Sequence, residues 1–371
     1  MNFDFSDDMK LLREEARRFL AERSSSKQVR LVLDGKTDFD RALWQSMAEL
    51  GWLGIAVPTD FGGSDLGYEA LCILAEEVGR ACASVPFSSS VYLATEALVL
   101  AGTPEQKRAW LPKLVSGKAI ATFALAEGAG NPSARKIKCV ERDGRLSGTK
   151  WPVADGAMAD FAVVVAQSAD GTPSLYLVDL TASGVTRAPL QTLDPARPHF
   201  KLTFDSVPAE RLSLDGRGWD NIVKFIERAA IVMAFEQLGG ADACLASATA
   251  YAKERYAFGR PIGSFQAIKH KLADMYVGNE LARSNAYWGA WALTKNAAEL
   301  PLAAASARVS ATQAYDFAAK ESLQTHGGMG MTWETDCHLF VRRSTILSGA
   351  LGTTSFWKDR IVTSLEMRNA P

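Results

Sequence analysis

Two short stretches in the last third of the chain hold residue types suited to binding an anion beside a flat ring. The first, "ERYAFGRPIGSFQ" at 254–266, places an arginine close to an aromatic residue and a glycine. The second, "QTHGGMG" at 324–330, packs three glycines into four positions, which lets backbone amides approach a bulky anion. The dinucleotide fingerprint G-x-G-x-x-G would need a third glycine at position 333, but Trp333 stands there and no β-branched run precedes it. A Rossmann loop is therefore excluded, and either stretch taken alone fits a simple helix end equally well.

The overall composition is that of an ordinary globular protein of 371 residues, long enough for two or three domains. Lys+Arg 41 balance Asp+Glu 42, so no basic field favours nucleic acid or an anionic membrane as a partner. The five cysteines are far apart without C-x-x-C spacing, and the four histidines lack metal-ligand spacing, so we expect neither a disulfide framework nor a metal site. We see no signal peptide and no uninterrupted apolar run of membrane-spanning length, which favours a cytoplasmic protein without a membrane span.

The elements that must position these stretches fall into three regions. Residues 1–120 repeat apolar positions at helical spacing, with Ser6 as the expected N-cap of the first helix. Residues 121–215 change to a period of two, and Asp143-Gly144 marks a β-hairpin. Residues 216–371 return to long helical periods, beginning with one very long helix after position 217. This order predicts an α+β fold that is mostly helical, with a β domain between two helical domains.

Several motifs in this order resemble those of the acyl-CoA dehydrogenase family of flavoproteins. The C-terminal stretches match its E-R-x-x-F-G…F-Q and Q-x-x-G-G-x-G patterns, and "LGWLGIAVPTDFGG" and "GTPEQKRAWLPKLVSGK" look like its N-terminal domain. "ATFALAEGAGN" and "GTKWPVADGAMADFAVVVA" look like its β domain. The resemblance covers essentially the whole chain. It implies an N-terminal helical domain, a middle antiparallel β-barrel or sandwich, and a C-terminal four-helix bundle.

The resemblance also implies FAD as cofactor and an acyl-CoA thioester as substrate. In this family FAD lies at a subunit interface, so part of each site serves the neighbouring subunit's flavin. The residues that would hold the pyrophosphate and adenine half of the neighbour's flavin are Arg255, Phe258, Gln266, Gln324, Gly327 and Gly328. The residues that would face the chain's own flavin are Ala126, Trp151 and Val153, and Thr353 is a further cofactor-binding candidate.

The chain departs from the family pattern along its own flavin-facing edge. The usual T-E-P-x-x-G-S-D loop has Ala126 in place of its threonine, and Asn131 and Pro132 in place of its serine and aspartate. The usual W-I-T strand reads Trp151-Pro152-Val153, which lacks the last hydroxyl and one backbone donor. This half of the site is therefore poorer in hydrogen-bond donors, while the half donated to a neighbour is intact.

The catalytic base is the largest departure. The family abstracts the acyl α-proton with a glutamate while a β-hydride passes to flavin N5, and this glutamate usually precedes G-T near the C-terminus, where Leu351 stands. Some members carry the base on the long helix, at a position that falls at Ala229. Glu236 projects within about 20° of Ala229 but roughly 10 Å further along, while Glu227 projects to the opposite side. Glu236 is thus the better candidate, although a structural carboxylate at that distance fits at least as well.

Two functions follow from this pattern. The first is an FAD-dependent acyl-CoA dehydrogenase that desaturates the α,β bond, as a homo-oligomer, passing electrons to an electron-transferring flavoprotein as is usual in the family. The second is a non-catalytic, half-site subunit of a hetero-oligomer with a homologous subunit. "GSFQAIKHKLADM" and "TLDPARP" look similar to a subgroup of bacterial steroid side-chain catabolism that pairs such subunits. A scaffold without flavin, the third reading, does not account for the intact donated half.

Two other features indicate a structural role rather than a catalytic one. Gly239-Gly240, inside the long helix, indicates a close helix crossing. His326, just before the glycine pair, is expected to shape that turn.

Overall fold

The computed structural model describes residues 5–212 and 218–369. They form two compact units, each built from segments distant in the sequence. One unit comprises Met1–Lys27, Cys72–Ala83 and Ala230–Pro371, and the other comprises Gln28–Leu71 and Ser84–Ala229. The expected change of domain at 215 to 216 lies outside the described residues, and the three-domain division of 1–120, 121–215 and 216–371 stays a prediction.

Residues 5–120 are mostly helical, as expected. The helices are α1 (Asp7–Arg23), α2 (Ser26–Leu33), α3 (Arg41–Glu49), α4 (Gly67–Arg80), α5 (Glu96–Ala101) and α6 (Pro104–Val115), with 3₁₀ turns η1 (Trp52–Gly54) and η2 (Thr59–Phe61). A π-helix, η3 (Phe87–Thr95), precedes α5 and is buried throughout. Ser6 caps α1 as predicted, because its Oγ accepts from the Met9 N–H at 3.3 Å.

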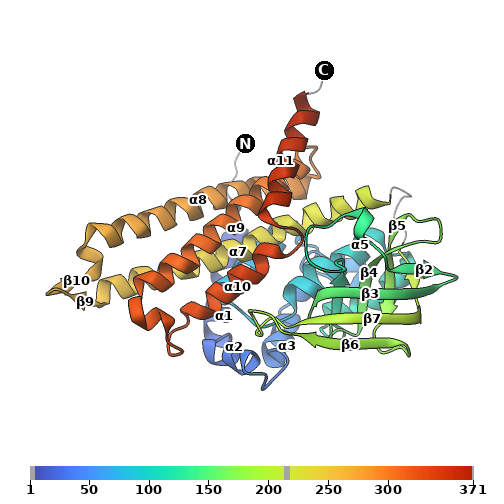
Figure 1. Cartoon of the computed structure of the whole chain (residues 1–371), viewed down its shortest axis with the longest axis horizontal. Coiled ribbons are helices and arrows are strands. Elements are labelled where there is room, and N and C mark those ends of the chain that lie inside the picture. Colours follow the sequence, from blue (N-terminus) through green and yellow to red (C-terminus); the bar gives the residue numbers. More distant parts are fainter. Residues whose placement is uncertain (1–4, 213–217, 370–371) are drawn as a thin grey trace. The chain divides into compact units, whose positions relative to one another are not determined.

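The middle of the chain forms one eight-stranded sheet (Figure 1). Its strands are β1 (Ala121–Ala124), β2 (Val140–Arg142), β3 (Arg145–Ala154), β4 (Phe161–Gln167), β5 (Pro173–Asp179), β6 (Val185–Leu190), β7 (His199–Pro208) and β8 (Glu210–Arg211), with a 3₁₀ turn η4 (Ala134–Lys136) before β2. The spatial order is β6-β7-β3-β2-β4-β5-β8, with β1 beside β4. Most pairs are antiparallel, but β1 and β2 each pair with β4 in parallel. The hairpin at Asp143-Gly144 is confirmed, since both residues have positive φ between β2 and β3.

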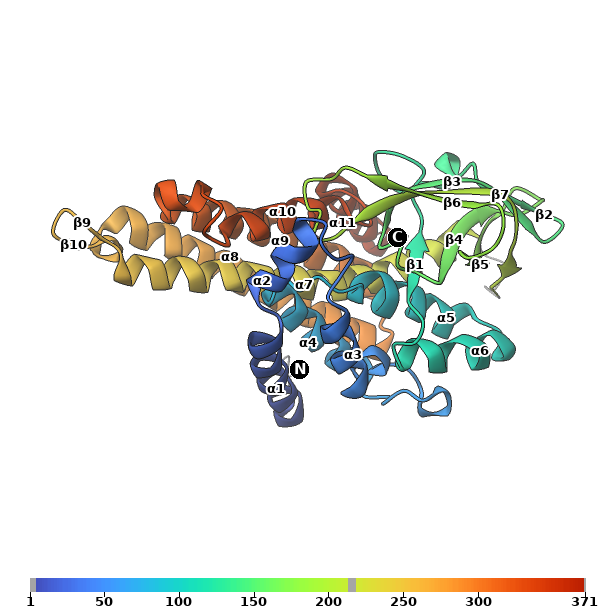
Figure 2. The same ribbon diagram turned by 90° about the horizontal axis from the view of Figure 1, so that it is seen from below.

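The last third contains the predicted long helices. They are α7 (Trp219–Glu254), α8 (Gln266–Lys295), α9 (Leu300–Thr325), α10 (Cys337–Gly349) and α11 (Thr354–Asn369). The turns between them are the hairpin β9 (Tyr256–Ala257) and β10 (Arg260–Pro261), and the 3₁₀ turns η5 (Ile262–Ser264) and η6 (Gly327–Met331). In both overall views α8 and α9 run alongside the C-terminal part of α7 (Figures 1 and 2). By length and composition α7 could cross a membrane, but 78% of its most apolar stretch is buried within the fold.

Glycines let α4 and α7 cross with their backbones in contact. A Cβ on Gly239 would lie 1.8 Å from the carbonyl oxygen of Glu76, and a Cβ on Gly79 would lie 1.9 Å from that of Glu236. A Cβ on Gly240 would meet the Tyr315 ring at 2.3 Å. The expected close crossing at Gly239-Gly240 is therefore present, and it is tighter than any side chain would permit.

We expect Gly239→Ala to lower the free energy of unfolding by about 1–3 kcal/mol, because the new methyl forces two packed helices apart. Gly278→Ala is the matched control, since that helical glycine has nothing within 4 Å of a new Cβ. The control should be neutral or stabilising by up to about 1 kcal/mol, because alanine favours a helix. Urea denaturation of both variants measures the difference, and equal midpoints would show that the crossing is not tight.

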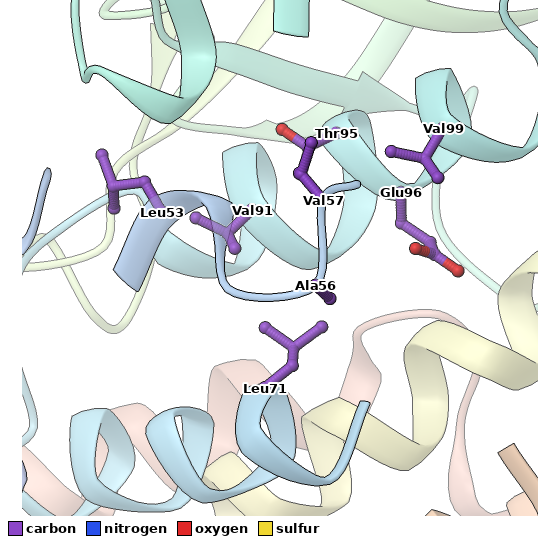
Figure 3. A pocket seen from close by; sticks show the side chains of 8 residues that line it. All are labelled: Leu53, Ala56, Val57, Leu71, Val91, Thr95, Glu96 and Val99. Carbon is purple, nitrogen blue, oxygen red and sulfur yellow. The ribbon is translucent and has the colours of Figure 1, made fainter. Parts of the chain in front are cut away.

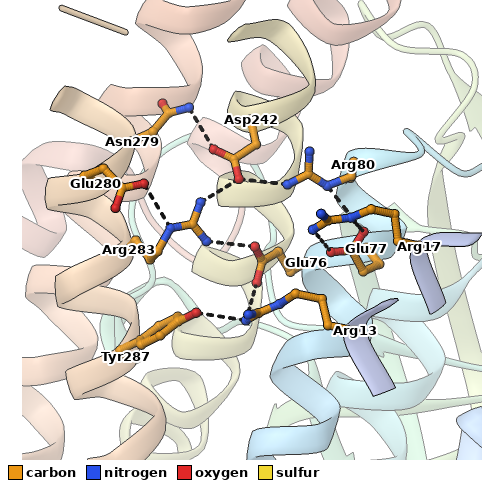
Figure 4. Close-up of polar contacts among 10 residues, drawn as sticks. All are labelled: Arg13, Arg17, Glu76, Glu77, Arg80, Asp242, Asn279, Glu280, Arg283 and Tyr287. Atoms are coloured by element: carbon orange, nitrogen blue, oxygen red, sulfur yellow. Dashed lines mark hydrogen bonds and ion pairs between the residues drawn. The ribbon is translucent and has the colours of Figure 1, made fainter. Parts of the chain in front are cut away.

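An ion-pair network joins α1, α4, α7 and α8 beside this crossing (Figure 4). Asp242 of α7 accepts from Arg80 at 2.8 Å and from Arg283 at 2.6 Å, and Arg283 also donates to buried Glu76 at 2.9 Å. The remaining members are Arg13, Arg17, Glu77, Asn279, Glu280 and Tyr287. Because each buried carboxylate has more than one cationic or hydroxyl partner, the network fixes how α1 packs on the bundle.

Candidate functional site

The arginine–aromatic stretch forms an exposed hairpin at one end of the helical bundle (Figure 1). Arg255 follows the last residue of α7, and the tip between β9 and β10 consists of Phe258 (φ 55°) and Gly259 (φ 78°). Phe258 is 95% exposed, with its ring 6.1 Å edge-on from Phe265. Within the described residues the Arg255 side chain has no hydrogen-bond or ion-pair partner, while Gln266 starts α8 with an exposed side chain.

The glycine stretch forms a tight turn after α9. Gly327 has φ 60°, and Gly330 is closely packed because a Cβ there would lie 2.3 Å from the Leu323 carbonyl oxygen. In contrast, a Cβ on Gly327 or Gly328 would meet nothing within 4 Å. The turn therefore leaves open space beside its backbone, which suits the close approach of a ligand.

An aromatic contact brings the two stretches together. The Tyr251 ring, in the last turns of α7, stacks on the His326 ring with 4.3 Å between centroids. His326 Nδ1 lies 2.8 Å from the Ser322 carbonyl oxygen. His326 thus shapes the glycine turn, as the sequence suggested, and its stacking on Tyr251 joins this turn to the end of α7, where Arg255 follows. That Arg255 and the glycine turn share one site stays a prediction.

The expected flavin-facing edge of the β domain is held together by its backbone. The Trp151 N–H donates to the Ala126 carbonyl oxygen at 2.9 Å, and the Gly128 N–H donates to that of Trp151 at 2.9 Å. Trp151 is 39% exposed and Ala126 is half-buried, whereas Val153 is fully buried. A register shift between Lys150 and Val153 separates the exposed Trp151-Pro152 from the regular ladder with β7. Trp151 and Ala126 therefore form the accessible part of this edge.

Leu351 lies in a strained turn between α10 and α11. It has φ 58°, a left-handed conformation that costs a residue with a Cβ roughly 1–2 kcal/mol. Below the turn the fully buried Arg308 of α9 donates to the carbonyl oxygens of Leu347 and Ala350, the latter at 2.9 Å. Thr353 caps α11, since its Oγ1 accepts from the Phe356 N–H at 3.4 Å. The turn is thus rigidly built, yet it presents an aliphatic side chain.

Glu236 lies in the helix crossing. Its side chain is buried, and its carbonyl oxygen faces Gly79 of α4. A carboxylate in this position is well placed for a structural role, which was the alternative to its assignment as the base. That assignment stays a prediction.

A small recess in the other unit contains a carboxylate that the sequence reasoning missed (Figure 3). It holds about 230 Å³, part of it open to solvent, and its lining is apolar apart from Thr95 and Glu96. Glu96 accepts from Tyr68 Oη at 3.0 Å and from Arg228 Nε at 3.0 Å. These two contacts give the carboxylate a structural role, and the lone acid in the apolar run "YLATEALVLA" was the signal that could have found it.

Neither cysteines nor acidic clusters offer another kind of chemistry in the part of the chain that the structure describes. All five cysteines are free and buried, and burial raises the pKa of the Cys244 thiol and raises that of Cys139 to about 12. Within 5–212 and 218–369 there is no group of three or more His, Cys, Asp or Glu side chains arranged for a metal ion.

Comparison with known proteins decides the family. The chain matches the family models "Acyl-CoA dehydrogenase, N-terminal domain" over residues 6–118 and "Acyl-CoA dehydrogenase, C-terminal domain" over residues 216–365. It is 32% identical over 339 residues to the acyl-CoA dehydrogenase IpdE2 of Mycobacterium tuberculosis, covering 91% of each chain. The chain belongs to the acyl-CoA dehydrogenase family. The acyl-CoA dehydrogenase FadE34 of the same organism is 33% identical, but the match spans 88% of this chain and 42% of FadE34.

Two solved structures share the whole fold. A Tcur3481-Tcur3483 steroid acyl-CoA dehydrogenase variant superposes with a TM-score of 0.90 at 32% identity, covering 98% of this chain and 99% of that one. A chain of the ChsE4-ChsE5 complex from Mycobacterium tuberculosis gives a TM-score of 0.90 at 27% identity, with 100% coverage of both. The mostly helical fold with a middle β-sheet domain, expected from sequence, is therefore confirmed. Family members are FAD-dependent oxidoreductases.

Proposed function

We propose that this chain acts in an oligomeric, FAD-dependent acyl-CoA dehydrogenase that introduces an α,β double bond into an acyl-CoA thioester. The observation that carries the proposal is the end of the bundle where the Tyr251–His326 stack links the helix before Arg255 to the Gly327-Gly328 turn. A phenylalanine that is 95% exposed, an unpartnered arginine and an open glycine cradle together form a binding surface without an occupant from the described part of this chain.

The residues at this end fit the pyrophosphate and adenine half of FAD. Arg255 offers a planar, permanently charged guanidinium to phosphate oxygens, and Gln266 stands at the positive end of the α8 dipole. Phe258 offers an aromatic face to a flat base. Gly327 and Gly328 allow the backbone to approach without a Cβ in the way. In the proposed oligomer these residues serve the flavin of a neighbouring subunit.

At its own flavin-facing edge, the chain supplies backbone groups in place of side-chain donors. Ala126 and Val153 have no hydroxyl, but the Ala126 and Glu127 N–H groups donate to no acceptor within residues 5–212 and 218–369. When bound, FAD would supply the acceptor for the hydride that leaves the acyl β-carbon. Position 351 takes no part in removing the α-proton, since a leucine side chain cannot accept one.

A second candidate function is a supporting subunit that completes a partner's site while its own is inactive. Leu351, Ala126 and Val153 favour it, because they stand where the family pattern has the base and two side-chain donors. The ChsE4-ChsE5 complex and the Tcur3481-Tcur3483 dehydrogenase are each named for two components, which supports a homologous subunit as partner. An electron-transferring flavoprotein is the proposed electron acceptor in either case.

The flavin content of the purified chain tests the proposal. Visible absorbance near one flavin per chain would support a complete site in a homo-oligomer. Flavin that appears only on co-purification with a base-bearing homologous subunit would support the supporting role. A chain that carries no flavin in either preparation would contradict both.

Arg255→Ala should weaken flavin retention by about tenfold or more, because it removes a charge-assisted contact worth about 1.5–3 kcal/mol. Lys253→Ala is the control, since it removes an exposed cation from the last turn of α7, outside the proposed site. Flavin retention is measured by dilution or dialysis of the oligomer followed by absorbance. Equal retention in both variants would refute the role of Arg255.

A further inference from the structure

A buried lysine lies directly behind the flavin-facing edge of the β domain. Lys150 of β3 is fully buried, and its Nζ donates to Glu127 Oε1 at 2.6 Å and to the Leu125 carbonyl oxygen at 3.1 Å. Burial lowers the pKa of Lys150, and the Glu127 carboxylate opposes this effect. An ammonium group in such surroundings is costly unless it is paired, and Glu127 supplies the opposite charge.

Glu127 connects this lysine to a second segment of the chain. Its Oε2 accepts from the Lys138 N–H at 2.7 Å, and its Oε1 accepts from the Cys139 N–H at 3.0 Å. Gln167 of β4 secures the same segment, because its Nε2 donates to the Ile137 carbonyl oxygen at 2.8 Å. The carboxylate thus joins its own loop, β3 and the segment at 137–139 at a single point.

The pairing of Glu127 with Trp151 sets the direction of the backbone at this edge. Glu127 forms a parallel bridge with Trp151, so Ala126 and Gly128 on either side are both hydrogen-bonded to Trp151. In this pairing the N–H groups of Ala126 and Glu127 remain without an acceptor in the described residues, at a half-buried edge. Since Ala126 and Val153 supply no hydroxyl, these two N–H groups are backbone donors that a ligand at this edge can use.

We propose that Glu127 and Lys150 are positioning residues that aim the Ala126 and Glu127 N–H groups at the flavin ring. The edge has no side-chain hydroxyl at Ala126 or Val153, and the pair compensates by holding the backbone N–H donors in place. The pair therefore enables the flavin-facing edge of this chain to bind FAD. The inference rests on the proposed FAD function, and it predicts that the chain binds FAD at its own edge.

The test compares two buried ion pairs of the same unit. Lys150→Met keeps the volume but removes the charge, and Glu127→Gln keeps the shape while weakening the pair. Glu96→Gln and Arg228→Met make the matched changes in the Glu96–Arg228 pair, whose closest contact is 2.9 Å and which lies on α5 and α7. FAD is added to the flavin-free full-length chain, and its affinity is followed by flavin fluorescence, its surroundings by the visible spectrum, and stability by thermal unfolding.

We expect Lys150→Met and Glu127→Gln to lower FAD affinity by about tenfold or more and to shift the visible band of the FAD that still binds. The control pair should lose comparable stability with unchanged FAD affinity and spectrum. A purely structural role would move stability in all four variants without a spectral shift.

Three outcomes would overturn the inference. Wild-type affinity and spectrum in both edge variants would show that the pair does not position the flavin, while leaving the FAD function intact. An equal loss of affinity in the control pair would assign the effect to general destabilisation. No FAD uptake by the unaltered chain would remove the inference, and the flavin content of its complex with a homologous subunit would then decide the proposed function separately.

Discussion

Leu351→Glu should raise the rate of acyl-CoA dehydrogenation by this chain about 10²- to 10⁴-fold, the range that a well-placed general base contributes. The backbone at position 351 already adopts φ 58°, so a glutamate would accept the same strained conformation as the leucine without an added cost. Arg308 and Thr353 hold the turn on both sides of this position. The substitution therefore changes the chemistry of the side chain while the backbone stays in place.

Leu351→Gln is the matched control for this gain, because it has the length and polarity of glutamate but cannot take a proton. Activity is measured as acyl-CoA-dependent bleaching of the flavin absorbance, with flavin content equalised between variants. Equal, low rates in both variants with flavin bound would contradict a complete homo-oligomeric site and favour the supporting subunit. A pH profile that rises with ionisation in the glutamate variant alone would identify the new carboxylate as the base.

Local patterns predicted most of the fold. The helical periods placed long helices in the last third of the chain and the start of α7 just after position 217, and Asp143-Gly144 located the β2–β3 hairpin. The strands β1 and β6 were not anticipated. β1 is only four buried residues long, and β6 carries Pro189 in a half-exposed run, so neither has a clear period of two.

The site was predicted in part, and the reason for the remainder is physical. Arg255, Phe258 and the glycine turn were found because their chemistry is visible in short local motifs. The Glu127–Lys150 pair and the contact of Arg308 with the turn after α10 were missed, because their members lie 23 and 42 residues apart in the chain and meet only after folding. Nothing in the spacing of "GTKWP" or "SARVSATQ" tells a buried cation from a solvated one.

Arg308→Ala should lower the free energy of unfolding by about 3 kcal/mol or more, the largest stability loss that we expect. The guanidinium donates to Gln237 Oε1 and to Thr312 Oγ1, the latter at 2.6 Å, as well as to the two carbonyl oxygens at the end of α10. Removing it leaves the Ala350 carbonyl oxygen without a donor among the described residues, at about 1–3 kcal/mol for such a group, and takes one donor from each of the other three acceptors. It also opens a cavity. Urea denaturation measures the loss, and the control is Arg368→Ala, which removes an exposed guanidinium and should be neutral.

The Arg308 guanidinium should also determine whether a glutamate at position 351 can act as the catalytic base. Because Arg308 fixes the carbonyl oxygen of Ala350, its loss frees the residue next to the new glutamate. A misplaced base loses most of its effect, so adding Arg308→Lys to Leu351→Glu should abolish most of the gained rate while keeping one buried charge. Hydrogen exchange at 350–353 should increase in parallel. If the double variant keeps the full rate although exchange increases, the turn does not need Arg308 to hold a base, and its buried guanidinium serves stability alone.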